Sequence, residues 1–271
     1  MSKNIKPLNN NELRVKAPTL FTSEPHFDVS DKYHFIPTID VIEEIRANNW
    51  YPVNVSVANV RDEEKEGFQQ HCVRFRHFED LLNPKDNAVE LLLFNSHDRS
   101  KAFSISAGIF RFVCANGLVI SDSVFETYKI KHLGERDNDV ANAVANITSI
   151  KPKLMEKINK LESITLNQSE KESFAKYSIP LRFEEHLEIN HNDLLIPHRV
   201  EDSKDDLYTV LNVIQENLLR GNISGINKDT KRRFTSKEIT SISKDTEVNK
   251  GIWDIAEKIA SIKDSNYLVA A

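Results

Sequence analysis

Hydrophobic and polar residues alternate along much of the first half of the chain. This period of two is typical of half-buried β-strands, and it occurs at residues 51–61, 72–78 and 103–109. Residues 89–94, in contrast, are almost continuously apolar, which is typical of a central strand that is buried on both faces. These four segments predict a β-sheet, and residues 129–131 predict one more strand.

The second half of the chain has the spacing of amphipathic helices. Apolar residues recur every three or four positions from Val140 to Leu161, and we expect Pro152 to kink or divide this helix. Four more helices are predicted, at residues 39–48 with Thr38 as N-cap, 169–177, 207–219 and 250–262. The order predicts an α+β fold, with a mainly antiparallel sheet in the N-terminal half and an α-helical C-terminal half.

The same pattern divides the chain into three parts. Residues 1–30 are polar and interrupted by prolines, so we expect an N-terminal arm. Residues 31–135 form the β-rich part. Residues 136–265 form the helical part, which we expect to pack with the β-rich part as one domain.

Composition narrows the class of protein. With 271 residues, 39% hydrophobic and 28% charged, the chain is expected to fold around a real core. It has no run approaching the roughly 18 apolar residues of a membrane helix, and its start lacks a signal peptide's apolar core. We therefore expect a soluble cytoplasmic protein without membrane association. The sequence leaves its oligomeric state open.

Positive charge is concentrated near the C-terminus although the net charge is −5. Residues 217–250 hold eight basic and four acidic residues, and the densest basic cluster consists of Lys228, Lys231, Arg232, Arg233 and Lys237. We expect a loop there, followed by a helix with Thr235 or Ser236 as its N-cap, which together would bind a phosphate backbone. The alternatives are ordinary surface charge, or pairing of Arg232 and Arg233 with acidic residues at 201–202 or 205–206.

Arginines of the β-rich half supply further candidates. Arg74 and Arg76 fall on one face of their predicted strand with Phe78, as a platform for single-stranded nucleic acid requires. An ordinary solvated sheet face is the alternative. Arg99 lies in residues 95–100, which form either a tight connection or a phosphate-binding strand end. Arg111 is the last candidate, just before Cys114.

Motifs for catalysis are missing from the sequence. It contains no GxxxxGK[ST], GxGxxG, HExxH or GxSxG pattern. Cys114 could act as a nucleophile only if the fold placed His77, His97 or His132 beside it, and a buried structural thiol is the alternative. His97 and Asp98 are adjacent, so on a strand they point to opposite faces and do not form a metal site. We therefore predict no catalytic residue, metal or cofactor.

Several stretches resemble one family in their order and spacing. In the first half they are LLLFNSHDRS (91–100), FRFVCANGLV (110–119) and KIKHLG (129–134); in the second half they are DLYTVLNVIQENLLRG (206–221), RRFTSKEITSI (232–242) and NKGIW (249–253). From about residue 30 to about residue 260, the chain resembles the phage/plasmid-like proteins of the domain of unknown function 932 (DUF932) family. The resemblance implies a place on phages, plasmids or integrated elements, and it implies no catalytic residues.

The charge cluster and this resemblance together favour a DNA-binding protein, with single-stranded DNA preferred, that acts in replication, recombination or protection of a mobile element. A second hypothesis is an interaction with a host or element-encoded protein, for which the acidic residues 62–66 would suit a basic partner. An enzyme built on Cys114 and a histidine is the third.

Overall fold

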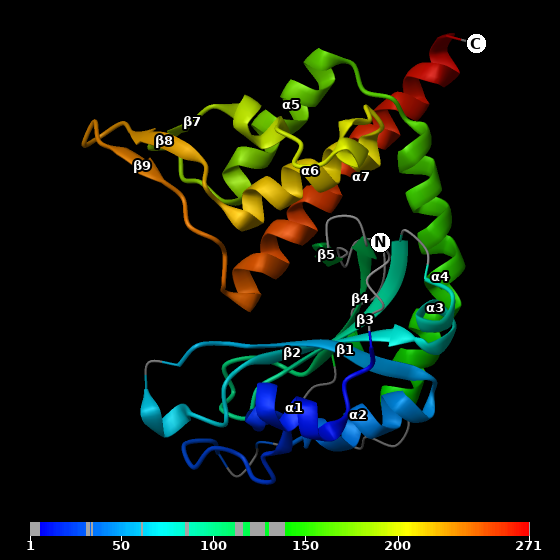
Figure 1. Cartoon of the computed structure of the whole chain (residues 1–271), viewed down its shortest axis with the longest axis vertical. Helices are drawn as coiled ribbons and strands as arrows, with labels where there is room; N and C mark the ends of the chain where they lie inside the picture. Colours follow the sequence, from blue (N-terminus) through cyan, green and yellow to red (C-terminus); the bar gives the residue numbers. More distant parts are fainter. Residues whose placement is uncertain are drawn as a thin grey trace. The chain divides into compact units, whose positions relative to one another are not determined.

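The computed structural model of the protein describes residues 6–30, 33, 35–60, 62–84, 87–111, 116–119, 128–129 and 139–270. The chain divides into two compact units, Met1–Pro152 (unit 1) and Lys153–Ala271 (unit 2). The large sheet lies in unit 1, and helices form most of unit 2 (Figure 1), which confirms the predicted α+β class.

Unit 1 is built on an antiparallel sheet in the order β1-β2-β3-β4-β5, with β6 paired to β4. The strands are β1 (Trp50–Val57), β2 (His71–His77), β3 (Asn87–Asn95), β4 (Ser104–Arg111), β5 (Asn116–Val119) and β6 (Tyr128–Lys129). The first four lie where the sequence pattern predicts them. Every residue of β3 after Asn87 is buried, which confirms the expected central strand.

The apolar face of this sheet carries the core of unit 1. Its fully buried side chains include Val73, Phe75, Leu91, Leu93 and Ile105. α2 (Thr38–Ala47) packs against β1, and Trp50 donates a hydrogen bond from its indole nitrogen to the Thr148 hydroxyl of α4 (Asp139–Ser163), 3.2 Å away. α4 continues through Pro152 and is not divided by it, and unit 1 ends at this residue.

The N-terminal segment is more ordered than its polar sequence predicts. It contains α1 (Asn10–Lys16), which begins with a capping box between Asn9 and Glu12, and a 3-10 helix, η1 (Pro18–Phe21). Leu13, Ala17 and Leu20 are fully buried, so these short elements belong to the core of unit 1. Two further short elements, η2 (Glu63–Lys65) and α3 (Phe78–Leu82), flank β2.

Unit 2 is organised around α6 (Leu207–Arg220), in which all residues from Leu207 to Leu218 are buried. α5 (Gln168–Ser178) and α7 (Ile242–Ala270) pack against it, and Gln215 of α6 donates a 2.5 Å hydrogen bond to Asn249 of α7. Three 3-10 helices complete the helical part: η3 (Ile179–Leu181), η4 (His191–Leu195) and η5 (Val200–Ser203). None of the described helices is long and apolar enough to cross a membrane.

A small antiparallel sheet in the order β7-β8-β9 lies at one side of unit 2 (Figure 1). It consists of β7 (Leu187–Ile189), β8 (Ser224–Asn227) and β9 (Arg233–Thr235). One face packs inward, where the ring of Phe234 lies 6.5 Å from that of Phe183. The sequence pattern did not predict this sheet.

Candidate nucleic-acid interface

The β8–β9 hairpin is shaped by two local features. At its tip, the side-chain oxygen of Asn227 accepts hydrogen bonds from the backbone amides of Asp229 and Thr230, and Lys231 has a positive φ of 57°. At its base, Gly221 ends α6 with a φ of 76°, and a Cβ there would lie 2.6 Å from the backbone carbonyl of Lys237. Only glycine fits this junction without strain.

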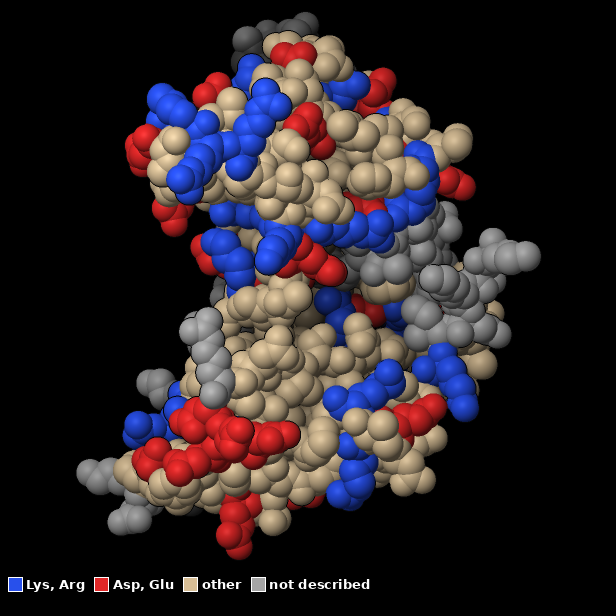
Figure 2. Space-filling view, turned by 60° about the vertical axis from the view of Figure 1, so that its left-hand side comes forward, with Lys and Arg blue, Asp and Glu red and all other residues tan. Residues whose placement is uncertain are grey.

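The predicted basic cluster lies on this hairpin and the residues after it. Lys228, Lys231, Arg232, Arg233 and Lys237 are all exposed. Residues 224–237 contain these five cations and a single carboxylate, Asp229. The five make no ion pair with a carboxylate among the described residues, and the ammonium group of Lys228 donates to the backbone oxygen of Glu185. Figure 2 shows Lys and Arg side chains gathered on the face that bears the hairpin.

Three of the four acidic residues that could neutralise this cluster are engaged elsewhere. Asp202 is buried and pairs with Arg199 at 2.7 Å, Asp205 accepts from Lys171 at 2.8 Å, and Asp206 caps α6 by accepting from the Thr209 amide. The alternative, in which Arg232 and Arg233 pair with this segment, is not found among the ion pairs of the described residues. The cations of the hairpin face solvent.

The local structure around the cluster differs from the expected loop and helix. Thr235 lies in β9, and the Ser236 hydroxyl oxygen accepts a hydrogen bond from the amide of Ile223 instead of capping a helix. The next helix, α7, begins only at Ile242. A β-hairpin, and no helix N-terminus, presents the cations.

Arg74 and Arg76 do not form a solvated platform. Arg76 is 1% exposed, its guanidinium bonds Glu90 at 2.6 Å, and it lies 4.5 Å from the centre of the Phe110 ring. Arg74 bonds the other oxygen of Glu90 at 2.5 Å. The cause is the strand register, because Glu90 of β3 stands directly opposite Arg76. Phe78 belongs to α3 and not to the strand.

The other two candidate arginines, Arg99 and Arg111, lie apart from this pair. Arg111 is 8% exposed and, by strand alternation from Phe110, projects from the opposite face of the sheet. Arg99 is exposed in a turn, with a φ of 64°, and the carboxylate of Asp98 accepts a hydrogen bond from the amide of Ser100. Residues 95–100 are thus a tight connection. The four arginines share no common surface.

A buried polar network in unit 1 was not anticipated from the sequence. Thr38, His71, Asn95 and His97 are all 0% exposed. Nδ1 of His71 lies 3.0 Å from the carbonyl oxygen of Gln69, so Nδ1 is assigned the proton and Nε2 accepts from the Thr38 hydroxyl at 2.8 Å. The Thr38 oxygen in turn accepts from Asn95 at 3.0 Å and from Nε2 of His97 at 3.3 Å.

This network explains why Thr38 does not cap α2. Its hydroxyl is fully used between two strands, and Pro37 occupies the cap position without a side-chain bond. Burial, and secondarily His97, lowers the pKa of His71 from 6.5 to about 3. A sealed, neutral imidazole has no contact with solvent, so the network fixes structure rather than exchanging protons with a ligand. The described residues contain no group of three metal-ligating side chains.

Cys114 and His132, on which the enzyme hypothesis depends, lie outside the described residues. The other thiol, Cys72, is 7% exposed in β2.

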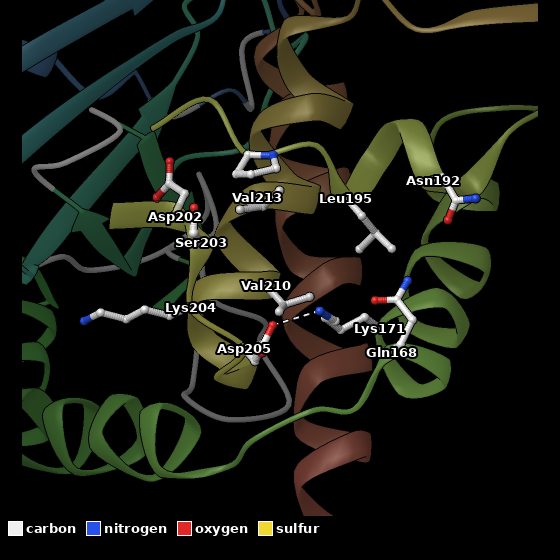
Figure 3. A pocket seen from close by; sticks show the side chains of 11 residues that line it. Gln168, Lys171, Asn192, Leu195, Asp202, Ser203, Lys204, Asp205, Val210 and Val213 are labelled. Atoms are coloured by element: carbon white, nitrogen blue, oxygen red, sulfur yellow. Dashed lines mark hydrogen bonds and ion pairs between the residues drawn. The ribbon is translucent and has the colours of Figure 1, made fainter. Parts of the chain in front are cut away.

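A pocket of about 370 Å³ in unit 2 lies between α5, α6 and the segment before α6 (Figure 3). Leu195, Val210 and Val213 supply its apolar surface. Three of its four charged groups are paired, because Lys171 pairs with Asp205 across the pocket and Asp202 pairs with Arg199. The fourth, Lys204, is exposed and makes no ion pair among the described residues, so the pocket offers a ligand one unbalanced charge.

The exposed face of the β7-β8-β9 sheet forms a shallow groove of about 540 Å³. The side chains that project into it are Glu188, Asn190, Ser224, Ile226, Arg233 and Thr235. Ile226 is 39% exposed, and Arg233 is its direct neighbour across the β8–β9 pair. The groove thus combines one guanidinium, one carboxylate, two hydroxyls, an amide and an apolar patch, and the cationic hairpin tip adjoins it.

Comparisons with known proteins identify the family of the chain. The family model described as "Domain of unknown function (DUF932)" matches residues 25–253. Two proteins of Escherichia coli (strain K12), UPF0380 protein YfjQ and UPF0380 protein YafZ, are each 30% identical over 255 residues, which is 94% of this chain and 92% of theirs. No solved structure matches the chain. Because the family model covers most of its length, this chain belongs to the DUF932 family.

Proposed function

We propose that the protein binds nucleic acid through the β8–β9 hairpin, and that its natural ligand is the DNA of a phage or plasmid during replication, recombination or protection. One observation supports this above the others: five exposed cations on one hairpin and its base, with one carboxylate among them. The resemblance to phage/plasmid-like proteins suggests the source of the DNA. The predicted binding residues also include arginines of unit 1, but Arg74 and Arg76 are paired with Glu90. Among the described residues, the predicted arginines and lysines are exposed as a group only on the hairpin and at its base.

Binding of this kind is dominated by phosphates. Exposed lysines and arginines displace the counterions of the nucleic acid, so the affinity falls steeply as salt rises. The net charge of −5 does not oppose this, because charges farther away than about 8 Å are largely screened at physiological salt. The expected interaction is therefore strong at low salt and largely independent of base sequence.

Fluorescence anisotropy with a labelled DNA strand tests the proposal. In one variant, the cations of the hairpin are changed to Gln: Lys228, Lys231, Arg232, Arg233 and Lys237. A control variant carries the same change in net charge at exposed lysines outside the hairpin: Lys6, Lys16, Lys153, Lys176 and Lys258. We expect the first variant to lose binding and the control to retain most of it. Equal affinity of both variants and the wild type would contradict the proposal.

A competing explanation for the same charges is protection of a sheet edge. β9 is an edge strand, and charged side chains on such strands prevent pairing with another chain. This explanation predicts that the hairpin variant self-associates while DNA binding is absent from the wild type as well. Light scattering on the wild type and the hairpin variant, together with the anisotropy measurement, separates the two explanations.

An acidic segment of unit 1 favours a second candidate function, binding of a basic protein. Asp62, Glu63, Glu64 and Glu66 are exposed around η2, and Figure 2 shows a dense group of acidic side chains on the face drawn there. Like-signed side chains on a short turn attract a basic surface and speed the encounter with it. A basic protein partner should be captured from a lysate even after nuclease treatment. Changing the three glutamates to Gln and Asp62 to Asn should abolish this capture. Unchanged capture would exclude this segment as the contact.

A further inference from the structure

The groove face of β9 presents its polar side chains in one row. In a β-strand, alternate residues project to the same face and lie about 7 Å apart. Arg233 and Thr235 of β9 both project into the groove. The extended pairing continues at Ser236, whose backbone bonds Asn222 and Ile223, so the exposed Lys237 follows on the same side.

This spacing fits the backbone of an extended nucleic-acid strand. Successive phosphates along one strand are separated by a distance close to that between alternate residues of β9. A guanidinium, a hydroxyl and an ammonium group in a row are groups that bind phosphate oxygens. The groove lies on a sheet of three strands, whose outer backbones are only about 10 Å apart, and this favours one extended strand over the broader double helix.

Two further side chains fix the side on which the phosphates lie. Glu188 of β7 stands across Ile226 from Arg233 in the same row of the sheet. Its carboxylate repels phosphate, so the backbone is confined to the β9 side of the groove. Ile226 then offers its exposed apolar surface to a base or sugar, because it lies between Glu188 and Arg233.

We infer that β9 and the two residues after it form a phosphate track for a single strand of nucleic acid, with successive phosphates at Arg233, Thr235 and Lys237 and with Glu188 excluding them from β7. This inference rests on the proposed function and specifies how the strand lies on that site. The remaining cations, Lys228, Lys231 and Arg232, attract the nucleic acid by their charge but do not lie in the row. Arg232 projects from the opposite face of the strand, and Lys231 lies in the turn.

Two double variants with equal charge test the track directly. Arg233→Gln with Lys237→Gln removes two track positions, and Lys231→Gln with Arg232→Gln removes two cations outside it. The probe is a fluorescent single strand of mixed sequence and about 20 nucleotides, longer than one binding module usually covers, in deoxy and ribo forms. We expect the track variant to lose at least about twenty-fold in affinity and about 1.4 from the slope of log affinity against log salt. The control variant should lose less than about five-fold.

Two single variants test the hydroxyl of the track and the carboxylate of β7 separately. Thr235→Val should weaken binding about three-fold without altering the salt slope, because it removes a hydroxyl and no charge. Glu188→Gln should strengthen binding two- to three-fold. Circular dichroism confirms that each variant is folded.

The outcomes separate this inference from the proposed function. Equal losses in the two double variants, or tighter binding of a duplex than of the single strand, would overturn the track while the hairpin remains the binding site. Wild-type affinity in both double variants and in the variant with all five cations replaced would overturn the proposed function itself. A large loss confined to the track variant supports both.

Discussion

Acidification should destabilise unit 1 through the buried imidazole of His71. In the folded protein the pKa of His71 is lowered from 6.5 to about 3 by burial and by His97 beside it. In the unfolded chain the imidazole regains its ordinary pKa, so below about pH 6.5 the unfolded state binds a proton that the folded state does not accept until about pH 3. Stability therefore falls as the pH falls through this window, and above it the contribution of His71 is constant.

The hydrogen bonds explain why the folded state does not take up this proton. Nε2 of His71 accepts from the Thr38 hydroxyl, whose oxygen already accepts from Asn95 and His97. An imidazolium would place one more donor against this oxygen inside a sealed core. Each pH unit inside the window costs about 1.4 kcal/mol, so acidification from neutral pH to about pH 5 should remove about 2 kcal/mol of unfolding free energy.

The chain provides a reporter for this measurement. Its two tryptophans lie in different units, Trp50 in unit 1 and Trp253 in unit 2, so a Trp253→Phe background assigns the fluorescence to unit 1. Urea unfolding at about pH 7.5 and at about pH 5 then gives the free energy of unfolding at both pH values. The His71→Gln variant starts from a lower stability because it loses ring contacts, but it should lose about 2 kcal/mol less on acidification. Equal losses on acidification in this variant and in the protein that retains His71 would refute the reasoning.

Two further predictions concern unit 2. Gly221→Ala should lower the free energy of unfolding of unit 2, measured in urea, by about 2 to 4 kcal/mol, because the positive φ and the contact with the Lys237 backbone both oppose a Cβ. The control is Gly67→Ala in unit 1, which has a φ of 89° but open space around it and should cost only about 1 kcal/mol. Equal costs in the two variants would rule out the contact with Lys237 as the cause. Glu216→Gln should cost about 3 kcal/mol, because this buried carboxylate bonds both Arg199 and Arg220 at 2.6 Å. The exposed pair of Lys244 and Glu247 is the control, and Glu247→Gln should change the free energy of unfolding by less than about 1 kcal/mol. A similar cost at both sites would show that burial of Glu216 is energetically unimportant.

Local pattern was sufficient to place the long elements of the fold. The alternation at residues 72–78 and the apolar run at residues 89–94 correspond to β2 and β3, because a strand must send alternate side chains to opposite faces. The pattern does not determine which residue lies opposite which. That register places Glu90 beside Arg76, and a carboxylate inside an otherwise apolar run gave no separate signal. The arginines were therefore expected in solvent and are found in a buried ion pair.

The short elements of unit 2 escaped prediction for a related reason. β7 and β9 have three residues each, too few for a period of two to stand out, and β8 contains Gly225, which disfavours a strand. The backbone of this glycine lies so close to β7 and Phe234 that a Cβ would be 2.7 Å from the backbone carbonyl oxygen of Glu188. Such close packing comes from the tertiary structure. The charge cluster could be read from the sequence, but the hairpin that presents it could not.

The arginines of the two sheets show what determines whether a cation on a strand is buried in an ion pair or exposed to solvent. In unit 1 the strand register supplies a carboxylate directly opposite Arg76, so the charge is neutralised and buried. In unit 2 the residue opposite Arg233 on β8 is Ile226, and Glu188 lies one strand further away. In the acidic segment before α6, Asp202 is already paired with Arg199, Asp205 with Lys171, and Asp206 forms the cap of α6. The cations of the hairpin consequently stay exposed without an ion pair among the described residues, and this difference is why we propose a binding role for the hairpin and assign the arginines of unit 1 to stability.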